Sequence, residues 1–104
     1  MEKKSRDSVL AQEVFLSYLD SKRRLALANI SKCSNNENRL KNDEMIVRYI
    51  EELLKHFDED SYRILYNEYI LRKPGKWYLE YYTKSTFYHL KNKATSKLIR
   101  CLHE

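Results

Sequence analysis

The chain has one glycine and one proline among its 104 residues, and this scarcity constrains its fold more than any other feature. β-Hairpins and bulges use these residues at nearly every turn, because glycine accepts positive φ and proline fixes a bend. Long helices joined by polar turns need neither residue. We therefore expect an all-α protein of four to five helices. Its core should be modest in size, since 34% of the residues are charged.

Two helices are expected in the first 59 residues, with a polar linker between them. The first should span residues 7–30, and the polar run at 20–24 could break or bend it. Residues 31–42 read SKCSNNENRLKN, and their Asn and Ser side chains compete with the backbone hydrogen bonds of a helix. We therefore expect a linker there. A second helix should follow, capped by Asn42 or Asp43. Its apolar side chains should share one broad buried face: Met45, Ile46, Tyr49, Ile50, Leu53, Leu54 and Phe57.

A third helix is expected over residues 61–71. Its spacing directs Ile64, Leu65 and Ile70 inward, together with some of its tyrosines. Pro74-Gly75 should end it, because proline cannot continue the helical hydrogen bonds and glycine accepts positive φ. Seven of the nine tyrosines lie beyond residue 60, and we expect them to line the core rather than to stack on single-stranded bases.

The last 29 residues are expected to form a short helix followed by a long one. Residues 76–82, KWYLEYY, are long enough for about two helical turns. Thr83 is a candidate N-cap for a final helix over residues 84–102. In that helix the inward stripe consists of Phe87, Leu90, Ala94 and Leu98. The small Ala94 in mid-stripe suits a close crossing with another helix.

The net positive charge of the chain comes entirely from its C-terminal part. Residues 1–59 hold 11 Lys/Arg and 11 Asp/Glu, whereas residues 60–104 hold 9 Lys/Arg and 4 Asp/Glu, a difference of +5. A basic surface suits a polyanion, because each neutralised phosphate releases counterions. A well-solvated helix face would give the same pattern, so charge alone does not decide between the two.

Residues 76–102 combine a short helix, a turn of about three residues and a longer basic helix, which is the order of a helix-turn-helix. In that motif the first helix braces the second, whose N-terminal turns enter the major groove of DNA. Cations and hydroxyls contact phosphates, whereas Asn and His side chains can read base edges. The candidate DNA-binding residues are Lys76, Thr83, Lys84, Ser85, Tyr88, His89, Lys91, Asn92 and Lys93. The alternative is an ordinary surface helix of a bundle.

Residues 62–99 resemble region 4 of bacterial sigma factors and the related small phage regulators of the ArpU and RinA type. In that pattern an apolar-aromatic helix leads into a loop and then into the helix-turn-helix. The residues that carry the resemblance are Ile64, Leu65 and Tyr69, then Thr83-Lys84-Ser85-Thr86-Phe87, and finally Lys91, Ala94 and Leu98. The phage regulators also have helical N-terminal halves of similar length, so the resemblance can extend over the whole chain.

The chain departs from this pattern at the turn. Tyr82 lies where the family often has glycine, and residues 79–81 replace a stretch that commonly contains a small residue. The resemblance implies a sigma region 4-like fold. It also implies transcriptional control, either by binding a promoter or by engaging RNA polymerase near one.

No motif for catalysis, a cofactor or a metal is present. His56, His89 and His103 lack ligand spacing, and no phosphate-binding glycine loop occurs. Cys33 and Cys101 are expected to be free thiols in a reducing cytosol. No segment has the apolar length of a signal-peptide core or a membrane span. We expect a cytoplasmic, nucleoid-associated protein that is not an enzyme, binds no cofactor and makes no membrane contact.

The sequence therefore predicts a sequence-specific duplex DNA-binding transcriptional regulator in two parts. Residues 1–59 would form a helical half that supplies core and could contact RNA polymerase or a second copy of the chain. Residues 60–104 would form the helix-turn-helix half. The alternative is a helical protein-interaction module that binds RNA polymerase or another protein without direct DNA binding. The localised charge favours DNA, and the departures at the turn favour the alternative.

Overall fold

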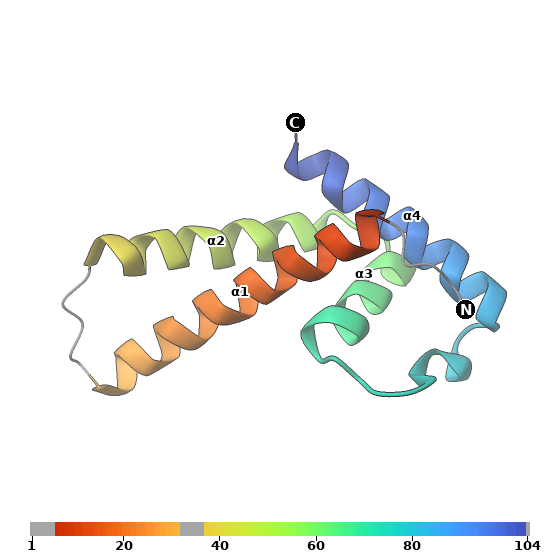
Figure 1. Ribbon diagram of the computed structural model, residues 1–104, viewed down its shortest axis with the longest axis horizontal. Coiled ribbons are helices and arrows are strands. Elements are labelled where there is room, and N and C mark those ends of the chain that lie inside the picture. The colour runs from red at the N-terminus through yellow and green to blue at the C-terminus, as the bar shows by residue number, and fades with distance from the viewer. Residues whose placement is uncertain (1–5, 32–36, 104) are drawn as a thin grey trace. The chain divides into compact units, whose positions relative to one another are not determined.

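A computed structural model describes residues 6–31 and 37–103, and every regular element within those ranges is helical (Figure 1). A π-helical turn continues the third α-helix, and a 3-10 turn precedes the fourth. The predicted all-α class is confirmed, with four α-helices in the described ranges. The elements in chain order are α1 (Arg6–Ser31), α2 (Glu37–Lys55), α3 (Glu59–Leu65), the π-helical η1 (Tyr66–Ile70), the 3-10 helix η2 (Trp77–Glu80) and α4 (Lys84–Leu102).

The structure tests the predictions about membrane spans and free cysteines only for the described residues. None of the described helices is both long and apolar enough to cross a bilayer. Cys101 is a free thiol, whereas Cys33 lies outside the described residues.

The chain divides into two units, and α1 contributes to both. One unit, which we call the α4 unit, comprises Met1–Phe15 and Phe57–Glu104. The other, the hairpin unit, comprises Leu16–His56. The start of α1 therefore belongs with the C-terminal helices, and the two units divide the chain differently from the halves 1–59 and 60–104.

In the hairpin unit, a buried carboxylate joins α1 to α2. Asp43 is 1% exposed and accepts hydrogen bonds from Ser21 Oγ at 3.0 Å and from Arg24 Nε and Nη2 at 2.9 Å each. The Arg24 guanidinium, with Ser21 adding to its effect, lowers the pKa of Asp43 below its ordinary value. A carboxylate buried in this way needs such partners, because burial without them costs several kcal/mol. The two helices are thereby fixed in register.

Three expectations for these helices differ from the structure. The polar run at 20–24 does not break α1, because it supplies the donors for Asp43. Asp43 is not an N-cap, since its oxygens are occupied by α1 and it lies within α2. Residues 37–42 are helical, so the linker is shorter than expected, and helix α2 starts at Glu37 rather than beside Asn42. Residues 32–36 of that linker lie outside the described residues.

The buried face of α2 is narrower than predicted. Ile50 and Leu54 are each 4% exposed, and Leu53 is only half-buried. Met45 is 69% exposed and Tyr49 is 52% exposed, so both lie outside the core. The buried positions recur three or four residues apart, because only one stripe of a helix can face its neighbour.

The α4 unit is built around α3 packed on α4. Its largest fully buried apolar side chains come from α1, α3 and α4 and are Phe15, Ile64, Leu65, Phe87 and Leu98, each at most 1% exposed. Phe15 stacks on Tyr69 with ring centroids 5.3 Å apart, and the Tyr69 hydroxyl is hydrogen-bonded to Ser8 at 3.1 Å. The N-terminal end of α1 is therefore part of this core. The prediction of buried Ile64 and Leu65 is confirmed.

The end of the third helix differs from the prediction. The π-helical turn η1 buries Tyr69 and leaves Ile70 half-buried, so Ile70 is not the inward residue we expected. Regular helix ends at Ile70, before Pro74-Gly75, and Arg72 follows at a positive φ of 51°. Left-handed residues commonly end helices, although this position usually holds glycine. Gly75, at φ 68°, makes a second turn five residues after the helix ends.

The last two elements match the prediction unequally. Residues 76–82 do not form a two-turn α-helix, since only the single 3-10 turn η2 is present. Thr83 is the N-cap of α4, as predicted, and α4 covers the expected range. Phe87, Ala94 and Leu98 are buried, whereas Leu90 is half-buried. The inner stripe of α4 is therefore part of the core, whereas its first three residues are exposed.

Candidate nucleic-acid interface

The N-terminal turn of α4 is closed by its own hydroxyls. Thr83 Oγ1 accepts a hydrogen bond from the Thr86 backbone N–H at 3.3 Å and donates to Thr86 Oγ1 at 2.9 Å. An N-cap of this kind satisfies one of the amides that the first helical turn leaves unpaired. Phe87 enters the core one turn later. The capped first turn is therefore ordered, and the residues around it have fixed directions.

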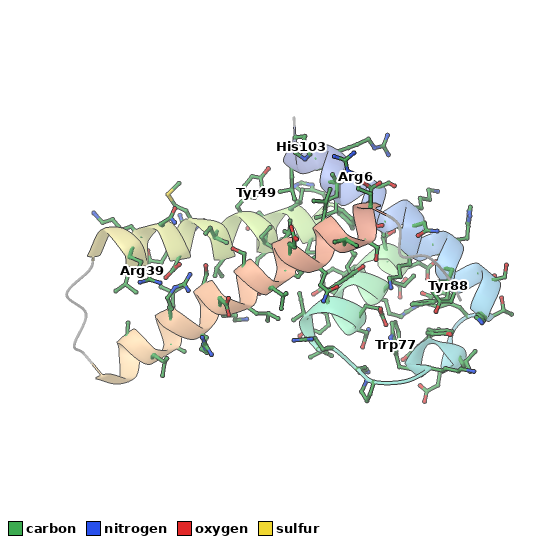
Figure 2. The ribbon with its side chains drawn as sticks, viewed as in Figure 1. Arg6, Arg39, Tyr49, Trp77, Tyr88 and His103 are labelled. Carbon is green, nitrogen blue, oxygen red and sulfur yellow. The ribbon has the colours of Figure 1, made fainter. Side chains whose placement is uncertain are left out.

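An aromatic cluster packs against the buried side of α4 around Phe87. Tyr78 of η2 stacks on Phe87 with centroids 3.9 Å apart and rings within 4° of parallel. Trp77 meets Phe87 edge-on at 5.7 Å, and Ile64 of α3 completes the buried centre. Trp77 and Tyr88 lie at the N-terminal end of α4 (Figure 2). The 3-10 turn η2, in place of the predicted two-turn helix, thus contacts α4 through its aromatic rings.

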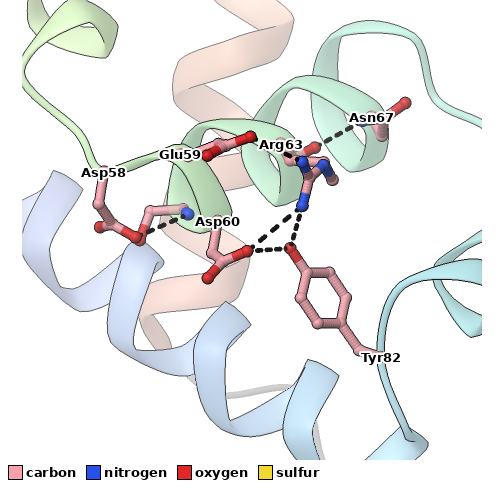
Figure 3. Close-up of polar contacts among 7 residues, drawn as sticks. Asp58, Glu59, Asp60, Arg63, Asn67 and Tyr82 are labelled. Atoms are coloured by element: carbon pink, nitrogen blue, oxygen red, sulfur yellow. Dashed lines mark hydrogen bonds and ion pairs between the residues drawn. The ribbon is translucent and has the colours of Figure 1, made fainter.

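Tyr82 connects the turn between η2 and α4 to helix α3 (Figure 3). Tyr82 Oη donates to Asp60 Oδ1 at 2.6 Å and accepts from Arg63 Nη1 at 3.0 Å, which joins the turn to α3. Arg63 also lies over the Tyr81 ring, 4.7 Å from its centroid. Burial raises the pKa of Tyr82, and the hydrogen bond to Asp60 adds to the effect. A tyrosine in place of glycine here therefore makes a contact that glycine could not.

A partly buried ion pair joins α4 to η1. Lys91 Nζ lies 3.0 Å from Glu68 Oε2, and the two side chains are 16% and 23% exposed. The other oxygen of Glu68 accepts from Trp77 Nε1 at 2.9 Å. Lys91 is thus directed inward, towards Glu68 and the rings of Tyr69 and Phe87. Its ammonium is therefore less available to an outside anion than those of the exposed Lys84 and Lys93.

The candidate residues fall into two groups. Seven are exposed, and six of these gather around the first three turns of α4: Thr83, Lys84, Ser85, His89, Asn92 and Lys93. The seventh, Lys76, precedes η2. Tyr88 and Lys91 are half-buried, and Tyr88 packs edge-on against Phe87. Of this first group, Ser85, His89, Asn92 and Lys93 lie on the side of α4 opposite its buried stripe, and Thr83 and Lys84 lie at the start of the helix.

Three of the five cations of α4 are accessible. Lys91 is paired with Glu68, and Lys97 lies 4.9 Å from the centroid of the Phe57 ring. Lys84, Lys93 and Arg100 are exposed and form no ion pair within residues 6–31 and 37–103. The helix contains no acidic side chain. Its outer face is therefore positively charged and polar.

The sequence prediction missed several exposed residues. Thr86 and Arg100 extend the outer face of α4, and Arg72 and Lys73 lie in the loop before η2. Their residue types were visible as part of the C-terminal excess of cations, but their exposure depends on how the helices pack. Across the described ranges, no group of three or more His, Cys, Asp or Glu side chains could hold a metal ion.

Comparisons with models of known protein families, with curated proteins and with solved structures gave no match to this chain.

Proposed function

We propose that this protein is a transcriptional regulator that binds duplex DNA through the outer face of α4. The observation that carries the proposal is the composition of that face. Lys84, Ser85, His89, Asn92 and Lys93 are exposed together at the start of a helix that has no carboxylate. An α-helix fits the major groove of B-DNA, and its N-terminal turns are the part that reaches the bases.

The side chains of this face have two complementary chemistries. Lys84 and Lys93 can neutralise phosphates, which contributes affinity without regard to sequence. Asn92 can pair with both edge atoms of an adenine, and Ser85 and His89 can donate to or accept from purines. Two cations for phosphates beside three hydrogen-bonding groups for base edges are the combination that sequence-specific binding to DNA requires.

The way α4 is held also favours recognition of one sequence. Three contacts hold the N-terminal part of α4. They are the hydrogen bond from Tyr82 to Asp60, the stacking of Phe87 on Tyr78 and the ion pair of Lys91 with Glu68. A helix held at three points loses little conformational entropy when it binds, so its contacts contribute more fully to affinity. The resemblance of residues 62–99 to sigma region 4 and to the ArpU and RinA regulators supports transcriptional control as the role of that binding.

Binding of a selected duplex tests the proposal. Duplexes enriched from a randomised pool by the full chain should bind more tightly than scrambled versions of the same composition. The difference should be at least tenfold at physiological salt, which is about 1.4 kcal/mol. Equal, weak binding to every duplex would contradict sequence-specific regulation.

The second candidate is a module that binds RNA polymerase or another protein without contacting DNA. The observation that favours it is η2, since a single 3-10 turn replaces the first helix of a usual helix-turn-helix. Co-purification of the polymerase with the full chain, together with no binding to any duplex, would support this candidate over the first.

A further inference from the structure

The loop between η1 and η2, residues 71–76, is an exposed basic segment outside α4. It reads LRKPGK, and all six residues are exposed. Arg72, Lys73 and Lys76 form no ion pair within the described parts of the chain. We call this segment the basic loop. It belongs to the same unit as α4, and η2 connects it to the N-terminal end of that helix (Figure 1).

The basic loop is held at both ends. At its start, the backbone N–H of Leu71 donates to the Tyr66 carbonyl at 2.9 Å, and that of Lys73 donates to the Asn67 carbonyl at 3.0 Å. At its far end, Trp77 Nε1 donates to Glu68 at 2.9 Å, which ties η2 back to η1. Both ends of the loop are therefore attached to η1.

The acidic residues nearest in sequence do not neutralise the loop. Both oxygens of Glu68 are already engaged, one by Trp77 and the other by Lys91. Glu80, in η2, forms no ion pair with the loop within the described residues. Three cations are therefore presented to solvent with their charge uncompensated.

The backbone of Arg72 adds an independent observation. Its φ of 51° lies in the left-handed region, which a long side chain adopts uncommonly and glycine adopts freely. A conformation of this kind persists only where the surroundings enforce it, and such positions cluster at functional sites. Here the hydrogen bonds of Leu71 and Lys73 hold the backbone on either side of Arg72, and the Arg72 side chain is exposed.

We propose that the basic loop is a second DNA-binding element, which contacts the phosphodiester backbone while α4 occupies the groove. Arg72, Lys73 and Lys76 would each neutralise one phosphate, and they would carry no information about base sequence. Arginine can bind a phosphate through two parallel N–H groups, which fixes orientation as well as charge. This inference rests on the proposed function, because it assigns further contacts to the same duplex.

The test compares two triple variants of the full chain on selected and scrambled duplexes over a range of salt concentrations. The loop variant is Arg72→Asn, Lys73→Gln and Lys76→Gln, with asparagine chosen because it tolerates positive φ. The matched control, Arg23→Gln, Lys41→Gln and Arg48→Gln, removes the same charge from exposed positions of the hairpin unit. Circular dichroism verifies that each variant is folded.

The loop variant should weaken binding to both duplexes by the same factor. Its slope of log affinity against log salt should fall by about 0.9 for each phosphate that is no longer neutralised, or about 2.7 for three. The control should change the slope by less than the value for one phosphate. A loop variant with the slope of the parent, or a control with an equal decrease, would overturn the loop assignment while leaving α4 as the binding helix. Weaker binding to the selected duplex alone would also overturn it. If the parent binds no duplex at any salt concentration, both the loop and the proposed function are wrong.

Discussion

Tyr82, in the turn before α4, donates a 2.6 Å hydrogen bond to Asp60 in the first turn of α3. The same hydroxyl accepts from Arg63, so one side chain connects the turn to two positions of α3. The start of α4, where the proposed DNA contacts lie, is thereby fixed relative to the helix that supports it. The phenol has a structural role that a glycine turn would leave to other residues.

Replacing Tyr82 with phenylalanine tests this connection. Tyr82→Phe removes the hydroxyl and keeps the ring, so the free energy of unfolding should fall by about 0.5–1.5 kcal/mol. Tyr81→Phe is the matched control, because no hydrogen bond of its hydroxyl is present in the described residues and its ring would still lie under Arg63. Denaturant melts of the two variants should differ. If they coincide, the Tyr82 hydroxyl does not stabilise the turn.

Two lysines of α4 should separate stability from binding. Lys91→Met leaves Glu68 without its ion-pair partner in a partly buried position, which should destabilise the protein by about 1–3 kcal/mol. Lys93→Met, on the exposed face, should leave stability within about 0.5 kcal/mol of the parent and weaken DNA binding. Thermal or denaturant melts and duplex titrations measure both effects. Equal stability of the two variants would mean that the Glu68 pair contributes nothing.

Neighbouring leucines of α2 test its corrected buried face. Leu54 is 4% exposed, and Leu54→Ala should cost about 2–5 kcal/mol through reduced burial and a cavity. Leu53→Ala should cost less, because Leu53 is only half-buried. Urea melts give both values. Equal costs for the two variants would support the broad face that the sequence predicted, and a larger cost for Leu53→Ala would contradict the corrected face.

The Asp43 ion pair should make stability depend on pH. The pKa of Asp43 is lowered in the folded protein by Arg24, so its contribution is present above the unfolded value of about 4 and is lost as the pH falls below it. Asp43→Asn should therefore be less stable than the parent at neutral pH, and the gap should narrow below about pH 4. Glu44→Gln, at an exposed position of α2, is the control. Urea midpoints that differ equally at pH 7 and pH 3 would rule out this linkage.

Helix α4 could be predicted almost completely from the sequence, because the features that define it are local. Thr83 lies next to the first turn that it caps, and Phe87, Ala94 and Leu98 repeat within one helix. The outer face of the candidate site follows from the same periodicity. This explains why Ser85, His89 and Asn92 are exposed as expected.

The parts that could not be predicted depend on partners far along the chain. Asp43 is of a residue type that often caps helices, and it is buried within α2 only because Ser21 and Arg24 bind its carboxylate. Lys91 is of a residue type that often contacts DNA phosphates, and it is directed inward only because it pairs with Glu68. No local pattern contains these pairs, because the members of each lie about 20 residues apart on different elements.

The proposed recognition face is tested most directly by its three hydrogen-bonding residues. Ser85→Ala, His89→Ala and Asn92→Ala should each lower affinity for the selected duplex by about 1–3 kcal/mol. Binding to a scrambled duplex at low salt should be nearly unchanged, because no cation is removed. Thr86→Ser, which keeps the hydroxyl that completes the Thr83 cap, is the matched control on the same turn and should behave as the parent.

The deciding measurement is the ratio of affinities for selected and scrambled duplex, obtained by competition for the parent and for each of these variants. We expect Asn92→Ala to reduce the ratio about tenfold or more, since each good base contact contributes about 1–3 kcal/mol of discrimination. An unchanged ratio for Ser85→Ala, His89→Ala and Asn92→Ala alike would contradict base reading by α4.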